Sequence, residues 1–135
     1  MPFALRSRWQ ALSFAAVIIA AAAAVAVTWQ SRHQSRKVAV AMVGGDPGRA
    51  PALIRRYGCA GCHTIPGIPG GDGQVGGPLA DIRQRVYVGG VLANSPDNLI
   101  QWIVAPQTYS PRSAMPATGI SQAEARDVAT YLYSR

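Results

Sequence analysis

Three side chains that can bind a metal or react as nucleophiles stand within five residues, in the stretch CAGCH at 59–63. The chain of 135 residues has no cysteine besides Cys59 and Cys62, and its second histidine, His33, lies far upstream of His63. Four kinds of site use such a cluster: a redox-active cysteine pair, a zinc site, a disulfide, or covalently attached haem.

The rest of the sequence argues against three of these sites. A thioredoxin-like redox pair needs a neighbouring βαβ unit, and no strand pattern is seen. A structural zinc site needs four ligands, usually from two such pairs. A disulfide between Cys59 and Cys62 would close almost no loop and constrain the unfolded chain very little. Covalent haem attachment remains: both thiols add to the vinyl groups, and His63 ligates the iron.

An iron held by His63 has a second axial position, for which Met115 is the candidate. It is the only methionine after the cysteine pair, and no histidine follows His63. Prolines on both sides keep its segment extended, whereas a methionine that only fills the core would be expected on a helical face. His33 and Met42 are weaker alternatives, because both lie in a predicted tether at 30–46, upstream of the folded domain. Two protein ligands leave no open position for substrate, which favours electron transfer over catalysis.

Short helices joined by loops rich in glycine and proline must position these residues, so the sequence predicts an all-α fold without strands. The helices are predicted within 46–58, 95–106 and 121–135. Asp46 can cap the first helix, and Ser95 the second. Ser121 and Glu124 form a capping box at the third.

An apolar run from Ala11 to Trp29 is long enough to cross a bilayer as a helix. Trp9 and Trp29 stand where the two membrane interfaces would fall. Residues 24–26 also fit a signal-peptide cleavage site, so a cleaved signal peptide remains the alternative. We favour a retained anchor. The expected segments are an N-terminal end at 1–10, on the cytoplasmic side if the resemblance described below holds, a transmembrane anchor at 11–29, a tether at 30–46 and a folded domain at 47–135.

The formal net charge of +7 belongs mainly to the first 37 residues, which contain five basic residues and no acidic one. From Asp46 onward, eight basic residues face six acidic ones. Nucleic-acid-binding domains usually carry a basic stripe interleaved with aromatic side chains, and none is seen here. We therefore expect the lipid bilayer, and no nucleic acid, among the partners.

The order of the motifs resembles that of class I (mitochondrial-type) c-type cytochromes over roughly residues 47–135. The likeness rests on CAGCH at 59–63, Gly77-Pro78-Leu79, NLIQWI with Trp102, Ser113-Ala114-Met115-Pro116 and the final EARDVATYLY. It implies three to four helices around one covalently bound haem c. It also implies that the Pro78 carbonyl orients the His63 ring, and that the first and last helices cross near Gly58 and Tyr131.

Trp102 is expected at the haem edge with its N–H toward a propionate, because a buried indole needs a polar partner. Packing in the core is the alternative. Arg83, Arg85, Tyr87 and Arg112 could neutralise the propionates, but each arginine is more simply a solvated surface charge.

The anchored form looks most like cytochrome c domains fused to or associated with bacterial haem–copper oxidases. This resemblance implies a single-electron carrier of a respiratory chain, between a quinol–cytochrome c reductase and a terminal oxidase or reductase. It also implies a single-pass protein of the bacterial inner (plasma) membrane, with the haem domain in the periplasm or outside. A fixed haem subunit of a larger membrane oxidoreductase is the alternative. A haem ligand sensor or peroxidase would need an open sixth position, against which Met115 argues.

Overall fold

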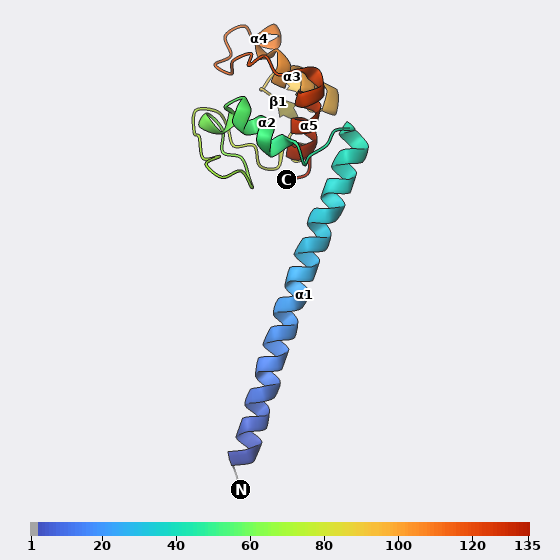
Figure 1. The fold of residues 1–135 in the computed structure, drawn as a ribbon, viewed down its shortest axis with the longest axis vertical. Helices are drawn as coiled ribbons and strands as arrows, with labels where there is room; N and C mark the ends of the chain where they lie inside the picture. The colour runs from blue at the N-terminus through green and yellow to red at the C-terminus, as the bar shows by residue number, and fades with distance from the viewer. Residues whose placement is uncertain (1–2) are drawn as a thin grey trace. The chain divides into compact units, whose positions relative to one another are not determined.

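The computed structural model describes the backbone of residues 3–135 and the side chains of residues 9, 10 and 12–135 (Figure 1). The helices are α1 (Phe3–Val43), α2 (Ala50–Arg56), α3 (Pro96–Val104), α4 (Pro106–Tyr109) and α5 (Gln122–Tyr133). Two 3-10 turns, η1 (Cys59–Gly61) and η2 (Ile82–Gln84), and two strands, β1 (Tyr87–Val88) and β2 (Leu92–Ala93), complete the described elements. The predicted helical fold is thus confirmed. The chain divides into two compact units, one ending at His33 and the other covering Gln34–Arg135.

Within the first unit the structure describes α1 as far as His33. The stretch Leu12–Val43 of this helix is long and apolar enough to cross a membrane. The most apolar window of this stretch has a mean hydropathy of 2.2, and none of it is buried. Phe14 and Ile18, for example, expose 71% and 67% of their surface. A continuous apolar surface of this kind suits a lipid environment.

The segment 30–46, expected as a tether, is helical as far as Val43. Its last turns belong to the second unit, where Ala39 is fully buried and Val43 is 3% exposed. The Gly45 amide then donates to Thr130 Oγ1 of α5 at 3.1 Å. A Cβ at Gly45 would lie 2.6 Å from that oxygen, so only glycine allows this approach.

Two neighbouring residues of α5 hold the chain that follows α1. Arg126 donates to the Val43 carbonyl at 3.0 Å and so satisfies an acceptor that the end of α1 leaves open. The buried Asp127 carboxylate accepts the Asp46 N–H at 2.8 Å and lies 3.0 Å from the Arg49 guanidinium. These partners offset the cost of burying its charge. Packing against the core therefore begins before residue 47.

The core of the second unit forms where α2 and α3 pack on α5 (Figure 1). The buried side chains on these helices include Leu53, Ile54, Leu99, Ile100, Ile103, Ala125, Val128, Ala129 and Leu132. Four of them, Ala125, Val128, Ala129 and Leu132, form an apolar stripe at helical spacing along α5. Tyr133 is also buried and donates to Asn94 Oδ1 at 2.7 Å, which ties α5 to the end of β2.

Two of the predicted helix starts are confirmed. The Ser95 hydroxyl accepts the Asn98 N–H at 3.2 Å at the start of α3. At the start of α5, Ser121 Oγ accepts the Glu124 N–H at 3.3 Å, and Glu124 Oε2 accepts the Ser121 N–H at 3.1 Å. This is the reciprocal capping box that the sequence predicts.

Two local predictions are wrong. The Asp46 carboxylate does not cap a helix but accepts the Gly48 N–H at 2.8 Å in a turn, and α2 begins only at Ala50. The segment 87–93 forms a small antiparallel hairpin, β1–β2, although no strand was expected. Strands of two residues are too short to show the alternation by which a strand is read from sequence.

The resemblance also implies that the first and last helices cross near Gly58 and Tyr131, and the prediction for Gly58 is wrong. Gly58 has a left-handed backbone (φ 71°), and a Cβ there would meet nothing within 4 Å. Its role is to end α2. Tyr131 is buried and donates to the Pro66 carbonyl at 2.7 Å. The chain approaches α5 closely at Gly45 and at Gly67, whose Cβ would lie 2.9 Å from the Tyr131 hydroxyl.

The capping box predicts a pH-dependent stability. Hydrogen bonds from Ser121 and from the Tyr57 hydroxyl, at 2.9 Å, lower the pKa of Glu124 to about 2. The unfolded value is about 4.3, so the carboxylate stabilises the fold above that pH and this contribution is lost as pH falls toward 2. Glu124→Gln should therefore destabilise the protein at neutral pH, and its difference from the native protein should shrink in acid.

Guanidinium unfolding followed by circular dichroism, at a series of pH values from neutral to acid, measures this difference. Asp97→Asn is the matched control, because Asp97 also lies in the first turn of a helix, α3, but is exposed. A difference between Glu124→Gln and the native protein that stays constant with pH would contradict the prediction.

Candidate functional site

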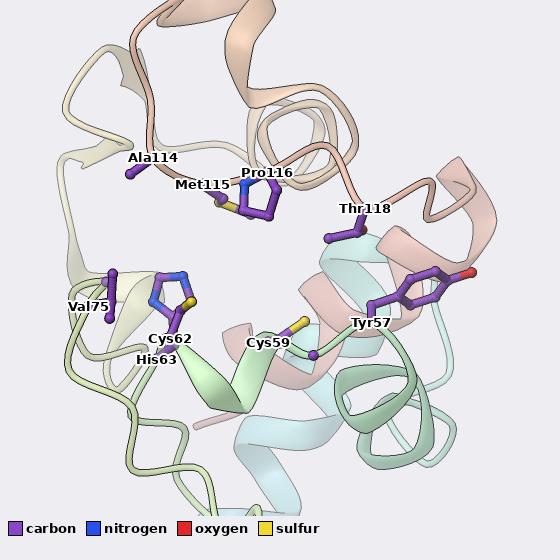
Figure 2. Close-up of a pocket in the computed structure, with 11 residues that line it drawn as sticks. Tyr57, Cys59, Cys62, His63, Val75, Ala114, Met115, Pro116 and Thr118 are labelled. Carbon is purple, nitrogen blue, oxygen red and sulfur yellow. The ribbon is translucent and has the colours of Figure 1, made fainter.

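Both cysteines and His63 lie on the tight turn that follows α2. The turn η1 begins directly after Gly58, and the His63 amide donates to the Cys59 carbonyl at 3.0 Å. Figure 2 shows Cys59, Cys62 and the His63 ring on the same side of a gap. No disulfide joins Cys59 and Cys62, so both sulfurs are available for attachment to haem, and burial raises the pKa of the Cys59 thiol in the chain before attachment.

The opposite side of the gap is formed by the extended segment that carries Ala114, Met115 and Pro116 (Figure 2). The Gln107 side-chain amide donates to the Met115 carbonyl at 2.6 Å, and the Met115 N–H donates to Ser113 Oγ at 3.2 Å. The short helix α4, which contains Gln107, therefore supports the loop. These bonds hold Met115 in place without a helix of its own.

Two cavities meet between these walls. One has a volume of about 110 Å³ and lies on the side of the cysteines and Tyr57, and the other has a volume of about 380 Å³ and lies on the side of Trp102. His63 and Met115 line both cavities, as do Gly76 and Ala114. They therefore form one slot, with His63 on one wall and Met115 on the other.

The slot fits the haem that the sequence predicts. Much of its lining is apolar, with Val75 and Pro116 on one side and Leu79, Ile82 and Leu99 on the other. Its donor groups are an imidazole nitrogen and a thioether sulfur on facing walls, which are the axial pair of many haem proteins. The two thiols lie along one edge, as covalent attachment requires. Ligation by His63 and Met115 stays a prediction.

One backbone carbonyl fixes the orientation of the His63 ring, but it is not the carbonyl that the resemblance implies. His63 Nδ1 lies 2.7 Å from the Gly77 carbonyl oxygen. The Pro78 carbonyl accepts instead from the Arg85 guanidinium, which also donates to the Ala80 carbonyl at 3.1 Å. A carbonyl can only accept, so the Nδ1 atom carries the proton and the other ring nitrogen is free to bind a metal.

Trp102 lies in the wall of the larger cavity. Its indole packs on Gly89 in the hairpin, where a Cβ would lie 2.5 Å from ring atoms. Arg85 and Tyr87 line the same cavity. The structure thus places Trp102 at the slot, while its contact with a propionate stays a prediction.

Several residues that line the slot were not singled out from the sequence, namely Tyr57, Val75, Gly76, Leu99 and Thr118. Tyr57 lies on the apolar face of a predicted helix, where packing is the simpler interpretation. Gly76 had one usable signal, since it precedes the Gly77-Pro78 pair. The others reach the slot only through the tertiary fold.

Comparisons with known proteins agree with this site. The sequence model of the cytochrome c family matches residues 49–135. Cytochrome c oxidase subunit 2 of Alkalihalophilus pseudofirmus is 33% identical over 84 residues, which are 61% of this chain and 23% of that subunit. The chain thus matches less than a quarter of the length of this relative. No solved structure matches the chain.

The contact of Trp102 with the hairpin predicts different effects at two adjacent glycines. Gly89 and Gly90 both have a left-handed backbone (φ 59° and 74°), so alanine is strained at either position by about 1–2 kcal/mol. Only at Gly89 would the new Cβ meet the Trp102 ring, whereas at Gly90 it meets nothing within 4 Å. Gly89→Ala should therefore cost about 1–3 kcal/mol more than Gly90→Ala, a typical penalty for overpacking.

The free energies of unfolding of the two variants, from guanidinium titrations of the haem-loaded protein, test this difference. Gly90→Ala serves as the control, because it carries the backbone strain without the collision. Equal destabilisation of both variants would show that the indole does not pack on the hairpin.

Proposed function

Since the chain belongs to the cytochrome c family, which binds haem c covalently through the cysteine pair, here Cys59 and Cys62, we propose that it is a membrane-anchored electron carrier of a respiratory chain. When bound, the haem supplies an iron that alternates between the ferric and ferrous states by one electron. The observation that carries the proposal is the position of His63 and Met115 on facing walls of one slot.

The residues of the slot suit electron transfer better than chemistry on a substrate. His63 and Met115 would occupy both axial positions of the iron and leave none for oxygen or peroxide. A thioether ligand stabilises the ferrous state and raises the reduction potential relative to a second histidine. The apolar side chains of Ile82 and Leu99, both buried, line the slot, and an apolar environment of the haem also acts on the potential.

We propose that α1 crosses the bacterial inner membrane once and places the haem domain in the periplasm or outside the cell. Within the stretch Leu12–Val43, the most apolar window has no buried part, which supports the crossing. The side follows from the family, in which haem is attached on the outer face of the plasma membrane. In this orientation Arg6 and Arg8 form the positive cytoplasmic flank.

The proposed donor is a quinol–cytochrome c reductase, and the proposed acceptor is a terminal oxidase. The similarity to a cytochrome c oxidase subunit supports an oxidase as the acceptor. An anchor holds a carrier at high effective concentration near membrane partners, so a small and transient contact is sufficient.

A second candidate is a fixed haem subunit of a larger membrane oxidoreductase, and one observation favours it. The relative in the comparison is itself named as a subunit of an oxidase.

Electron flow in isolated membranes tests the carrier function. The reduced α-band of this haem should appear when quinol is added without oxygen, and should disappear when oxygen is admitted. An inhibitor of the quinol-oxidising complex should block the first change, and cyanide the second. A haem that does not respond during respiratory turnover would contradict the proposal. Purification in mild detergent separates the two candidates: a carrier is recovered alone, and a fixed subunit with its partners in constant proportion.

A further inference from the structure

The glycine-rich loop 72–77 lies directly on the backbone of the haem-attachment motif. The Gly73 amide donates to the Ala60 carbonyl at 3.3 Å, and the Gly76 amide donates to the Cys62 carbonyl at 2.7 Å. A Cβ at Gly73 would lie 2.7 Å from the Cys62 amide nitrogen. Any side chain at that position would force the loop away from the motif.

Gly76 has a different neighbour, the imidazole of His63. A Cβ at Gly76 would lie 2.6 Å from His63 Nδ1 and 2.9 Å from Nε2, and would also collide with Cε1. All three of these atoms lie on one edge of the ring. Gly76 is not among the glycines with a left-handed backbone, so backbone freedom is not the reason for glycine here. The reason is the close approach to the ring.

The ring of His63 is thus held by two adjacent residues. Gly76 lies against its edge, and the Gly77 carbonyl accepts the proton of Nδ1. The contact at Gly76 and the hydrogen bond at Gly77 come from successive residues of one loop. A displacement of the ring at Gly76 would therefore also change the hydrogen bond.

We propose that Gly76 is a positioning residue that fixes the rotation of the His63 imidazole, and through it the reduction potential of the haem iron. The proposal rests on the proposed function, in which His63 ligates the iron. A hydrogen bond from Nδ1 to a carbonyl increases the basicity of the ligating nitrogen, which stabilises the ferric state. A side chain at Gly76 that pushes the ring away weakens this bond and raises the potential.

Three alanine variants of the full-length, haem-loaded protein test the role of Gly76. Gly76→Ala should raise the midpoint potential in a redox titration and shift the g-values of the ferric electron paramagnetic resonance spectrum, which depend on the orientation of the axial ligands. Gly70→Ala is the control, because Gly70 lies outside the attachment motif and the lining of the slot, and a Cβ there meets nothing within 4 Å. Its left-handed backbone (φ 72°) makes alanine cost stability without touching the ring, so the potential and the g-values should stay unchanged. Gly73→Ala disturbs the same loop at the motif backbone and not at the ring, so it should lower stability but shift the g-values less than Gly76→Ala does.

An unchanged potential and unchanged g-values in Gly76→Ala would overturn the proposal, as would equal shifts in Gly73→Ala. The near-infrared sulfur-to-iron band reports the ligation itself. Its absence from the native protein would contradict the proposed function, whereas a normal band with no effect of Gly76→Ala contradicts only the positioning role.

A measurement on the native protein covers the case in which Gly76→Ala does not assemble with haem. In the proton nuclear magnetic resonance spectrum of the ferrous form, the α-protons of Gly76 should show strong nuclear Overhauser effects to the ring protons of His63. Their presence supports the contact on which the proposal depends, and their absence overturns it.

Discussion

The buried face of α5 holds together parts of the chain that are far apart in the sequence. Thr130 and Asp127 bond the linker that follows α1, Tyr131 bonds the loop at Pro66, and Tyr133 bonds Asn94. The helices α2 and α3 pack on the same helix. Because the turn with the cysteines follows α2 directly, and Trp102 belongs to α3, the packing on α5 sets the distance between walls of the slot. A destabilising substitution in α5 would therefore disturb the slot through several of these contacts.

The slot itself is built from loops and turns, with few hydrogen bonds of regular secondary structure. Glycines allow one loop to lie against the motif backbone and the His63 ring, and proline-bounded chain presents Met115 from the other wall. A small domain with so many loops buries little apolar surface by itself, and a large covalently bound group can supply the missing core. Haem binding and folding are therefore expected to support each other in this protein.

Much of the site could be predicted from the sequence because its chemistry is local. The spacing of Cys59, Cys62 and His63 restricts the ligand, and Met115 is the single methionine after them. The capping residues of α3 and α5 were also found, since a cap depends on neighbours within one turn. The apolar run from Ala11 to Trp29 could also be found, because it is a continuous stretch of the sequence.

What the sequence could not provide depends on contacts between distant segments. Gly77, and not Pro78, faces the His63 ring, because the Pro78 carbonyl is bonded to Arg85. The segment 30–43 is helical although its composition suggested a tether, because Ala39 and Val43 gain burial against the domain. The polar and basic composition of residues 30–37 does not show that the residues after them pack against the folded domain.

The proposed electron transfer depends most on the axial pair of His63 and Met115, and one optical measurement on the native protein tests this pair. The ferric protein, purified from membranes, is examined in the near infrared, and the ferrous protein is then mixed with carbon monoxide. We expect a weak sulfur-to-iron band in the ferric form and no binding of carbon monoxide by the ferrous form. A missing band together with immediate binding of carbon monoxide would show that Met115 is not a ligand and that the iron is open, as in a sensor or an enzyme.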